Sequence, residues 1–223
     1  MRIHIVQKDI KDTDYSGHLE AVLKQQVDLV CFGELSTSGC LYRPREVDSL
    51  ETIVKSFEKY NFGILLGFPY QTDEGLFNSC LYYKNGAYQI YSKIRLFEPM
   101  NEHLTYKPGR QLGLFETDFG KVGVAICYDL RFPDIFSSLK KAGAWVIFVP
   151  AAFPRVRIAD WRELLVERAR DNNVYVIGIN AVGNDGVNEF GGTSMVIDPW
   201  GRVLTRASEE HEEVLRIDLE LHK

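Results

Sequence analysis

Residues 121–133 read Lys-Val-Gly-Val-Ala-Ile-Cys-Tyr-Asp-Leu-Arg-Phe-Pro. The stretch begins as a short apolar run, typical of a buried strand, and leads through a turn into a predicted helix. Cys127 therefore stands at the carboxyl end of a strand and beside the N-terminus of a helix. Unpaired backbone N–H groups and the positive end of the helix dipole lie there, and both favour a thiolate over a thiol. We expect an α/β protein in which Cys127 is a candidate nucleophile.

The rest of the chain repeats this alternation of short apolar runs and amphipathic segments. About twelve strands against four helices favour two packed sheets with helices outside over a single doubly wound sheet. Asn85-Gly86 predicts a two-residue hairpin turn, and Asp160 is expected to cap the last helix. The strands are predicted at 2–7, 28–32, 62–68, 76–83, 87–92, 111–116, 121–126, 144–149, 174–179, 192–198, 203–207 and 213–218, and the helices at 16–26, 45–59, 132–142 and 160–172.

Two more reactive side chains follow predicted strands, and a third lies in a loop. Glu34 and Lys93 each close an apolar run, whereas Glu102 lies in the loop 101–109. Ligands of α/β proteins bind at the carboxyl ends of strands, so these residues are candidates for one site. Each of them alone is more often structural: a buried thiol, a capping or surface carboxylate, or a solvated lysine. Their combination favours a catalytic site.

Composition limits the class of protein. The chain has 223 residues, 45% hydrophobic residues and a net charge of −5, which suit one soluble domain over 1–223. It contains no basic stripe for nucleic acid, no apolar stretch long enough for a membrane span and no signal peptide. We therefore expect a cytoplasmic protein that binds neither nucleic acid nor membrane.

Cysteine and glycine patterns give no sign of a cofactor. The four cysteines have no C-x-x-C spacing, which disfavours a zinc site or a disulfide framework and predicts free thiols. Neither G-x-G-x-x-G nor G-x-x-x-x-G-K-[ST] occurs, so nucleotide binding is not indicated. We expect no metal and no cofactor.

Three motifs occur in a fixed order: Gly33-Glu-Leu35, Lys93-Ile-Arg-Leu-Phe97 and Gly123-Val-Ala-Ile-Cys-Tyr-Asp-Leu-Arg-Phe-Pro133. With them the chain resembles the nitrilase superfamily of carbon–nitrogen hydrolases from about residue 2 to residue 220. The resemblance implies a four-layer αββα sandwich of two mixed β-sheets. The string from Glu102 to Gly109, together with the cysteine motif, is most similar to the omega-amidase branch.

The resemblance also implies roles for the candidate residues. Cys127 would be the nucleophile that forms a thioester, and Glu34 the general base. Lys93 and the backbone N–H of Tyr128 would stabilise the oxyanion, and Glu102 would orient the lysine. The expected activity is hydrolysis of a small linear (keto-)acid amide to the acid and ammonia. We expect Lys93→Met to lose most of the rate with little change in fold stability.

A substrate of this class carries a carboxylate, which arginine binds well through two parallel N–H bonds. Arg155 and Arg157 lie in a loop after a predicted strand, and Arg131 follows the nucleophile, so all three are candidates. Phe153 and Trp161 could shape the acyl pocket. For the arginines an ion pair, and for the aromatic residues a core position, are the structural alternatives.

Three other functions remain to be considered. A hydrolase of N-carbamoyl amino acids or other aliphatic amides would use the same site. A Cys–His hydrolase is disfavoured because the residues flanking Cys127 lack the glycines that its tight turn prefers. An inactive scaffold would be favoured only if a catalytic residue were replaced.

We also expect a homodimer through the interface usual for the superfamily, weakened because the chain ends at Lys223 without a further C-terminal segment.

Overall fold

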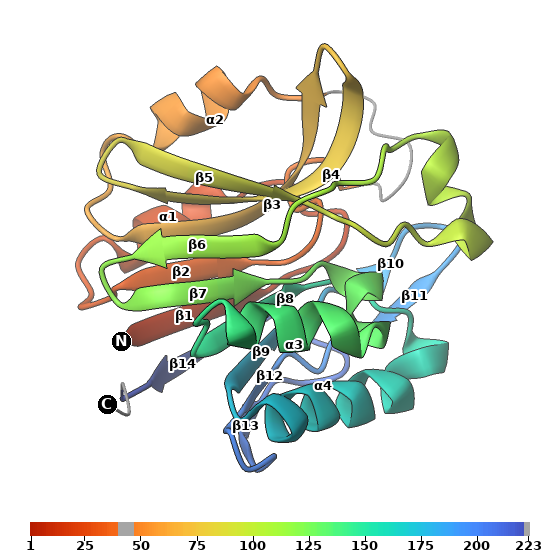
Figure 1. The fold of residues 1–223 in the computed structure, drawn as a ribbon. Helices are drawn as coiled ribbons and strands as arrows, with labels where there is room; N and C mark the ends of the chain where they lie inside the picture. Colours follow the sequence, from red (N-terminus) through yellow and green to blue (C-terminus); the bar gives the residue numbers. More distant parts are fainter. Residues whose placement is uncertain (40–46, 221–223) are drawn as a thin grey trace.

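The structure is a computed structural model that describes residues 1–39 and 47–220. Two six-stranded β-sheets pack face to face, and a pair of helices covers the outer face of each (Figure 1). Both sheets contain parallel and antiparallel neighbours. The expected four-layer αββα sandwich of two mixed sheets is therefore confirmed. Cys40 and residues 45 and 46 of the predicted second helix lie outside the described residues.

The first sheet contains β1 (Arg2–Gln7), β2 (Leu29–Phe32), β3 (Gly63–Thr72), β4 (Gly75–Lys84), β5 (Ala87–Ser92) and β14 (Glu213–Asp218). Its strand order is β14-β1-β2-β3-β4-β5, with β1, β2 and β3 parallel and each outer strand antiparallel to its neighbour. Alternation along β2 separates two cores: Leu29 and Cys31 pack between the sheets, whereas Val30 and Phe32 pack on the outer side.

The second sheet contains β6 (Gly113–Thr117), β7 (Gly120–Val124), β8 (Val146–Pro150), β9 (Tyr175–Ile179), β12 (Met195–Ile197) and β13 (Val203–Arg206). Its order is β13-β12-β9-β8-β7-β6, again with three parallel strands, β7, β8 and β9, in the centre. In each sheet the carboxyl ends of the three parallel strands therefore lie at the same end of the sheet. Glu34 follows β2 and Cys127 follows β7 at these ends.

The helices are α1 (Ser16–Val22), α2 (Leu50–Phe57), α3 (Pro133–Lys141) and α4 (Ile158–Asn172). Helices α1 and α2 cover the first sheet, and α3 and α4 cover the second (Figure 1). One prediction about them is wrong: α4 begins two residues before Asp160, and no side chain caps it. Asp160 instead accepts a hydrogen bond from Arg131 at 2.6 Å, and this contact leaves its carboxylate unavailable as a cap.

Two short strands were not predicted. β10 (Val182–Asn184) and β11 (Glu189–Gly191) form a separate two-stranded sheet. Each has only three residues, too few for an alternating pattern to stand out in the sequence.

The predicted hairpin at Asn85-Gly86 is confirmed, since both residues have the positive φ angles, 51° and 84°, that such a turn requires. In the described part of the chain, no helix has both the length and the apolar character needed to cross a membrane.

Candidate active site

The structure brings together three of the predicted residues, although about 60 positions separate the first from the second along the chain. Glu34 follows β2, Lys93 follows β5, and Glu102 opens the short 3-10 helix η2 (Glu102–Leu104). Lys93 Nζ lies 2.8 Å from Glu34 Oε1 and 2.9 Å from Glu102 Oε2. All three side chains are fully buried, so one ammonium group is held between two carboxylates inside the protein.

Asn78 completes this group, and the sequence analysis did not identify it. Its Nδ2 donates to Glu34 Oε1 at 2.7 Å and to Glu102 Oε1 at 2.8 Å. The charges of Lys93, Glu34 and Glu102 sum to −1, so a neutral donor that contacts both carboxylates offsets part of the cost of their burial. One sequence signal could have identified Asn78: its amide stands in the largely apolar strand β4, two residues before Cys80 and so on the same face of the sheet. A polar group at such an inward position needs a partner.

Backbone N–H groups also donate to both carboxylates. The N–H of Ala152, just after β8, donates to Glu34 Oε2 at 3.0 Å. The N–H of Phe97 donates to Glu102 Oε2 at 2.6 Å. Glu34 comes from the first sheet and Ala152 follows a strand of the second, so this bond joins the two halves of the sandwich at the site.

Cys127 lies at the start of the 3-10 helix η3 (Cys127–Arg131), directly after the second sheet's β7 and two connecting residues. Its φ angle is 46°, in the left-handed region that costs a residue with a side chain about 1–3 kcal/mol. This turn leaves the N–H of Tyr128 in the first turn of η3, where the helix supplies no acceptor. The sharp turn therefore presents a thiol and a backbone donor side by side.

The groups around Cys127 shift the pKa of its thiol in opposite directions. Burial raises the pKa of the thiol well above its usual range, and the negative charge of Glu34 raises it further. Lys93 and the backbone N–H of Ala152 lower the pKa of the same thiol. A raised pKa favours the thiol over the thiolate, so a nearby base helps to make the sulfur nucleophilic.

A third buried carboxylate, Asp129, holds the turn at Cys127 in place, and sequence reasoning did not assign it a role. Asp129 accepts hydrogen bonds from the Ile126 N–H at 2.9 Å, the Arg95 N–H at 2.8 Å and the Tyr91 hydroxyl at 2.7 Å. Burial raises the pKa of Asp129 to about 6. Because Arg95 lies two residues after Lys93, Asp129 connects the lysine segment to the cysteine turn.

A small pocket opens above Cys127. Two of the predicted substrate-binding residues, Arg131 and Phe153, line it. Its other walls are largely apolar, and a second guanidinium, that of Arg157, stands at its rim. The lining residues are Phe97, Met100, Cys127, Tyr128, Arg131, Ala152, Phe153, Pro154 and Arg157.

The other two predicted substrate-binding residues do not line this pocket. Arg155 turns away and binds the carboxylate of Glu189, with Nε 2.9 Å from Oε1. Trp161 is fully buried one layer behind Phe153, with ring centroids 5.2 Å apart, and its indole N–H donates to the backbone oxygen of Thr193. Its spacing on α4 points it into the core, so its contribution is to support Phe153.

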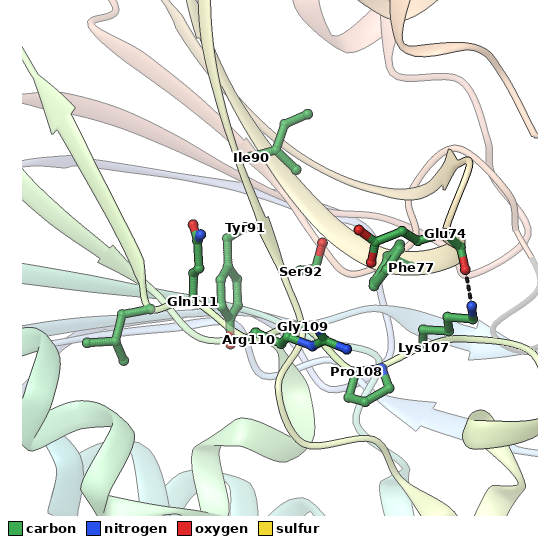
Figure 2. Close-up of a pocket in the computed structure, with 11 residues that line it drawn as sticks. Glu74, Phe77, Ile90, Tyr91, Ser92, Lys107, Pro108, Gly109, Arg110 and Gln111 are labelled. Atoms are coloured by element: carbon green, nitrogen blue, oxygen red, sulfur yellow. Dashed lines mark hydrogen bonds between the residues drawn. The ribbon is translucent and has the colours of Figure 1, made fainter.

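A larger groove lies elsewhere, at the end of β5 (Figure 2). Ile90, Tyr91 and Ser92 form one side, the segment 107–112 forms another, and Lys107 Nζ donates to the backbone oxygen of Glu74 across it. None of the predicted site residues lines this groove.

Within residues 1–39 and 47–220, no group of three or more His, Cys, Asp or Glu side chains is arranged to hold a metal ion.

Comparisons with known proteins agree with this geometry. The sequence profile of the carbon–nitrogen hydrolase family matches residues 15–223. The chain is 41% identical over 133 residues to 2-oxoglutaramate amidase of Bacillus subtilis, a match that covers 60% of this chain and only about half, 51%, of that relative. It is 32% identical to the omega-amidase of Mus musculus over 90% of this chain and 79% of the relative.

A solved structure gives the same result for the fold. The crystal structure of a CN-hydrolase superfamily protein of Xanthomonas campestris, described with an arsenic adduct in its active site, superposes with a TM-score of 0.88 at 30% identity. The superposition covers 97% of this chain and 89% of that one. With the family profile matching nearly its whole length, the chain belongs to the carbon–nitrogen hydrolase family.

Proposed function

We propose that this protein is a thiol amidase that hydrolyses a small linear ω-amide of a (keto-)acid to the acid and ammonia. One observation carries the proposal: Cys127 occupies a left-handed turn at the base of a pocket, and the charges of Glu34 and Lys93 both act on its thiol. A thiol, a carboxylate base and a fixed cation can supply the nucleophile, the proton acceptor and the oxyanion stabilisation that acyl transfer to cysteine uses.

In the first half of the reaction, Glu34 accepts the thiol proton while Cys127 Sγ attacks the amide carbonyl. Positioned proton transfer of this kind contributes about 10²–10⁴-fold to a rate. The Lys93 ammonium and the Tyr128 N–H stabilise the resulting oxyanion, and one such donor is worth about 2.7–4 kcal/mol. When the tetrahedral intermediate collapses, the C–N bond breaks and Glu34 returns the proton, so ammonia leaves and a thioester remains on Cys127.

In the second half, Glu34 removes a proton from a water molecule, which attacks the thioester carbonyl. The C–S bond then breaks, the thiol regains its proton, and the carboxylic acid is released. Glu102 keeps Lys93 in place throughout, because both of its oxygens lie within 3.0 Å of Nζ and one also accepts from the Phe97 N–H. Glu102 is therefore a positioning residue.

The choice of substrate is supported by two observations. Relatives that are 41% and 32% identical bear the names 2-oxoglutaramate amidase and omega-amidase. The pocket combines apolar walls with two arginines, Arg131 and Arg157, which suits a short carbon chain that ends in a carboxylate. Hydrolysis of an N-carbamoyl amino acid or another aliphatic amide would use the same catalytic residues and is the alternative.

Ammonia release from a panel of substrates tests the proposal. We expect turnover of 2-oxoglutaramate or 2-oxosuccinamate to exceed that of simple aliphatic amides, N-carbamoyl amino acids and a nitrile. Turnover of the carbamoyl compound alone would overturn the ω-amide assignment and keep the mechanism. Turnover of none of them would favour an inactive, scaffold-like protein.

Mass spectrometry of acid-quenched protein tests the nucleophile separately. Wild-type protein incubated with substrate should carry one acyl group, and Cys127→Ala should carry none. The described cysteines Cys31 and Cys80 are also free and buried. An adduct on Cys31, Cys40 or Cys80 in the variant would reassign the nucleophile.

Cytoplasmic location belongs to the same proposal and is supported by the three free cysteines of the described chain, since thiols persist in a reducing compartment. A homodimer stays a prediction, which light scattering after size-exclusion chromatography would check.

A further inference from the structure

The charges around the pocket are arranged in two groups of opposite sign. The buried group of Lys93, Glu34 and Glu102 sums to −1. At the mouth, Arg131 and Arg157 face the pocket, and Asp160 is the carboxylate paired with Arg131, so this outer group sums to +1. A linear substrate with one carboxylate is therefore attracted at the mouth and repelled near the nucleophile.

Two of the three candidate arginines are already bound to carboxylates. Arg131 NH2 lies 2.6 Å from Asp160 Oδ2, and this contact lowers the pKa of Asp160, so the pair stays charged. Arg155 is held from several sides: Nε by Glu189 at 2.9 Å, NH1 by Glu210 at 3.6 Å, and NH2 by the backbone oxygen of Glu209 at 3.1 Å. Neither guanidinium offers an uncompensated positive charge.

Arg157 differs from both. It lines the pocket together with Cys127, and its side chain is exposed. Among the residues that the structure describes, no carboxylate lies within 4.0 Å of its guanidinium. The outer group therefore owes its net positive charge to this side chain.

We propose that Arg157 binds the carboxylate of the substrate and so directs the distant amide carbon toward Cys127. The proposal rests on the proposed ω-amidase function and adds to it the residue that sets the orientation. With the carboxylate at the rim, the amide end is the part of a short linear chain that can reach the nucleophile. The reversed orientation would bring the carboxylate beside Glu34 and Glu102, where like charges in a buried site repel.

The apolar walls between the two charge groups suit the same orientation. Phe97, Met100 and Phe153 line the same pocket as Cys127 and Arg157, and they offer contacts to methylene groups but no charge. The pocket near Cys127 has a volume of about 20 Å³, room for little more than one water molecule. Binding of a five-carbon substrate therefore has to move the rim side chains, and the exposed Arg157 is free to close on the carboxylate.

Arg155 and Arg157 provide a matched pair of variants. They lie two residues apart in the same 3-10 turn, η4 (Arg155–Arg157), but only Arg157 lines the pocket. We would measure kcat and KM of the wild type, Arg157→Ala, Arg157→Lys and Arg155→Ala. The substrates are 2-oxoglutaramate, glutaramate and the uncharged 4-oxopentanamide, which keeps the chain and lacks the carboxylate.

The expected result is selective. For the two carboxylate substrates, Arg157→Ala should raise KM by about 10- to 100-fold, the usual worth of a charge-assisted hydrogen-bond pair, with a smaller effect on kcat. For 4-oxopentanamide, the same variant should match the wild type within about 2-fold, because no charge is lost. Arg157→Lys should recover part of the KM, since it keeps the charge but not the forked geometry. Arg155→Ala should behave as the wild type on all three substrates.

Two outcomes would overturn the assignment. Equal losses on the charged and uncharged amides would mean that Arg157 supports the loop and does not bind the carboxylate. Equal effects of Arg155→Ala and Arg157→Ala on the charged substrates would mean that the general positive field attracts them.

A binding measurement separates this proposal from the proposed activity. Calorimetry with glutaramate on Cys127→Ala, with and without Arg157→Ala, needs no turnover. A dissociation constant raised about 10-fold or more by the second change supports the role of Arg157 even if the amidase assay fails. An unchanged constant, or no binding to Cys127→Ala at all, overturns it whatever the assay shows.

Discussion

The buried acids near Cys127 form two groups, the pair Glu34 and Glu102 and the single Asp129, and these groups are stabilised in different ways. Glu34 and Glu102 share the ammonium of Lys93, fully buried between them. Asp129 instead accepts from three uncharged donors, namely two backbone N–H groups and the Tyr91 hydroxyl. The charges of the first group act on the Cys127 thiol, whereas the second group holds backbone in place. The comparison teaches that burial of an acid indicates function only together with the nature of its partners.

The largest effect is expected for Lys93→Met, which removes the cation from the first group. Activity should fall by at least about 10²-fold, because the oxyanion loses a charged donor worth about 2.7–4 kcal/mol. The buried position changes the stability expected from the sequence: removing one partner of a buried ion pair costs about 3–5 kcal/mol. Urea denaturation of the wild type and of Lys93→Met measures this loss of stability.

Wild-type stability in Lys93→Met would contradict our account of the first group. As a matched control, Lys59→Met removes an exposed lysine that pairs with Glu20, and it should change stability by at most about 1 kcal/mol.

The next effect is a dependence of stability on pH that arises from Asp129. An unfolded aspartate loses its proton near 3.8, whereas burial raises the pKa of folded Asp129 to about 6. Between these values the folded protein binds more protons, so this contribution is complete below about 3.8 and is lost as the pH rises through about 6. The difference of about two units corresponds to about 3 kcal/mol.

Asp129→Asn isolates that contribution. The free energy of unfolding of the wild type, measured relative to this variant by guanidinium denaturation, should decrease by about 2–3 kcal/mol between pH 4 and pH 7. A difference that does not vary with pH would mean that the folded acid titrates normally. The variant should also lose activity, because an amide nitrogen replaces one of the oxygens that hold the turn before Cys127.

A smaller effect is expected for Asn78→Ala, which deletes the uncharged donor of the first group. Glu34 and Glu102 each lose one hydrogen bond there, and an unsatisfied buried partner costs about 1–3 kcal/mol. We expect lower thermal stability and a changed pH profile of kcat/KM, since Asn78 contacts the base directly. Asn78→Asp should be more harmful, because it adds a third carboxylate to the same site. A neutral result for both variants would remove Asn78 from the site.

The smallest effect is expected at the pocket mouth, for Asp160→Asn. Its ion pair with Arg131 is partly exposed, and such pairs contribute about 0–1 kcal/mol. Denaturation should therefore detect little, in contrast to the buried Lys93 pairs. A loss of stability above about 2 kcal/mol would mean that the partly exposed Arg131–Asp160 pair stabilises the fold as strongly as the buried Lys93 pairs, against our account.

Much of the fold and the centre of the site could be predicted from the sequence. Short apolar runs predicted the strands of both large sheets, and their ends predicted where Glu34, Lys93 and Cys127 lie. Glu102 was a weak candidate by its place in a loop, and its role was implied only by the family resemblance. Local patterns succeed here because strand ends and the reactive side chains that follow them are adjacent in the sequence.

The residues that were missed depend on contacts between distant segments. Asn78 lies within a strand, and nothing nearby in the sequence shows that Glu34 and Glu102 converge on its amide. Arg155 and Arg157 share a loop, and only Arg155 turns toward an acid, Glu189, which is more than 30 residues away in the sequence. Trp161 fits both a pocket and a core, and only the packing of α4 decides.

The origin of the site in both sheets has a consequence for how the protein is made. Glu34 and Lys93 follow strands of the first sheet, and Cys127 follows a strand of the second. The first sheet also needs β14, from the C-terminal end of the chain, beside β1. Under the proposed mechanism, the base and the ammonium group therefore meet the thiol only when nearly the whole chain has folded and both sheets have packed together.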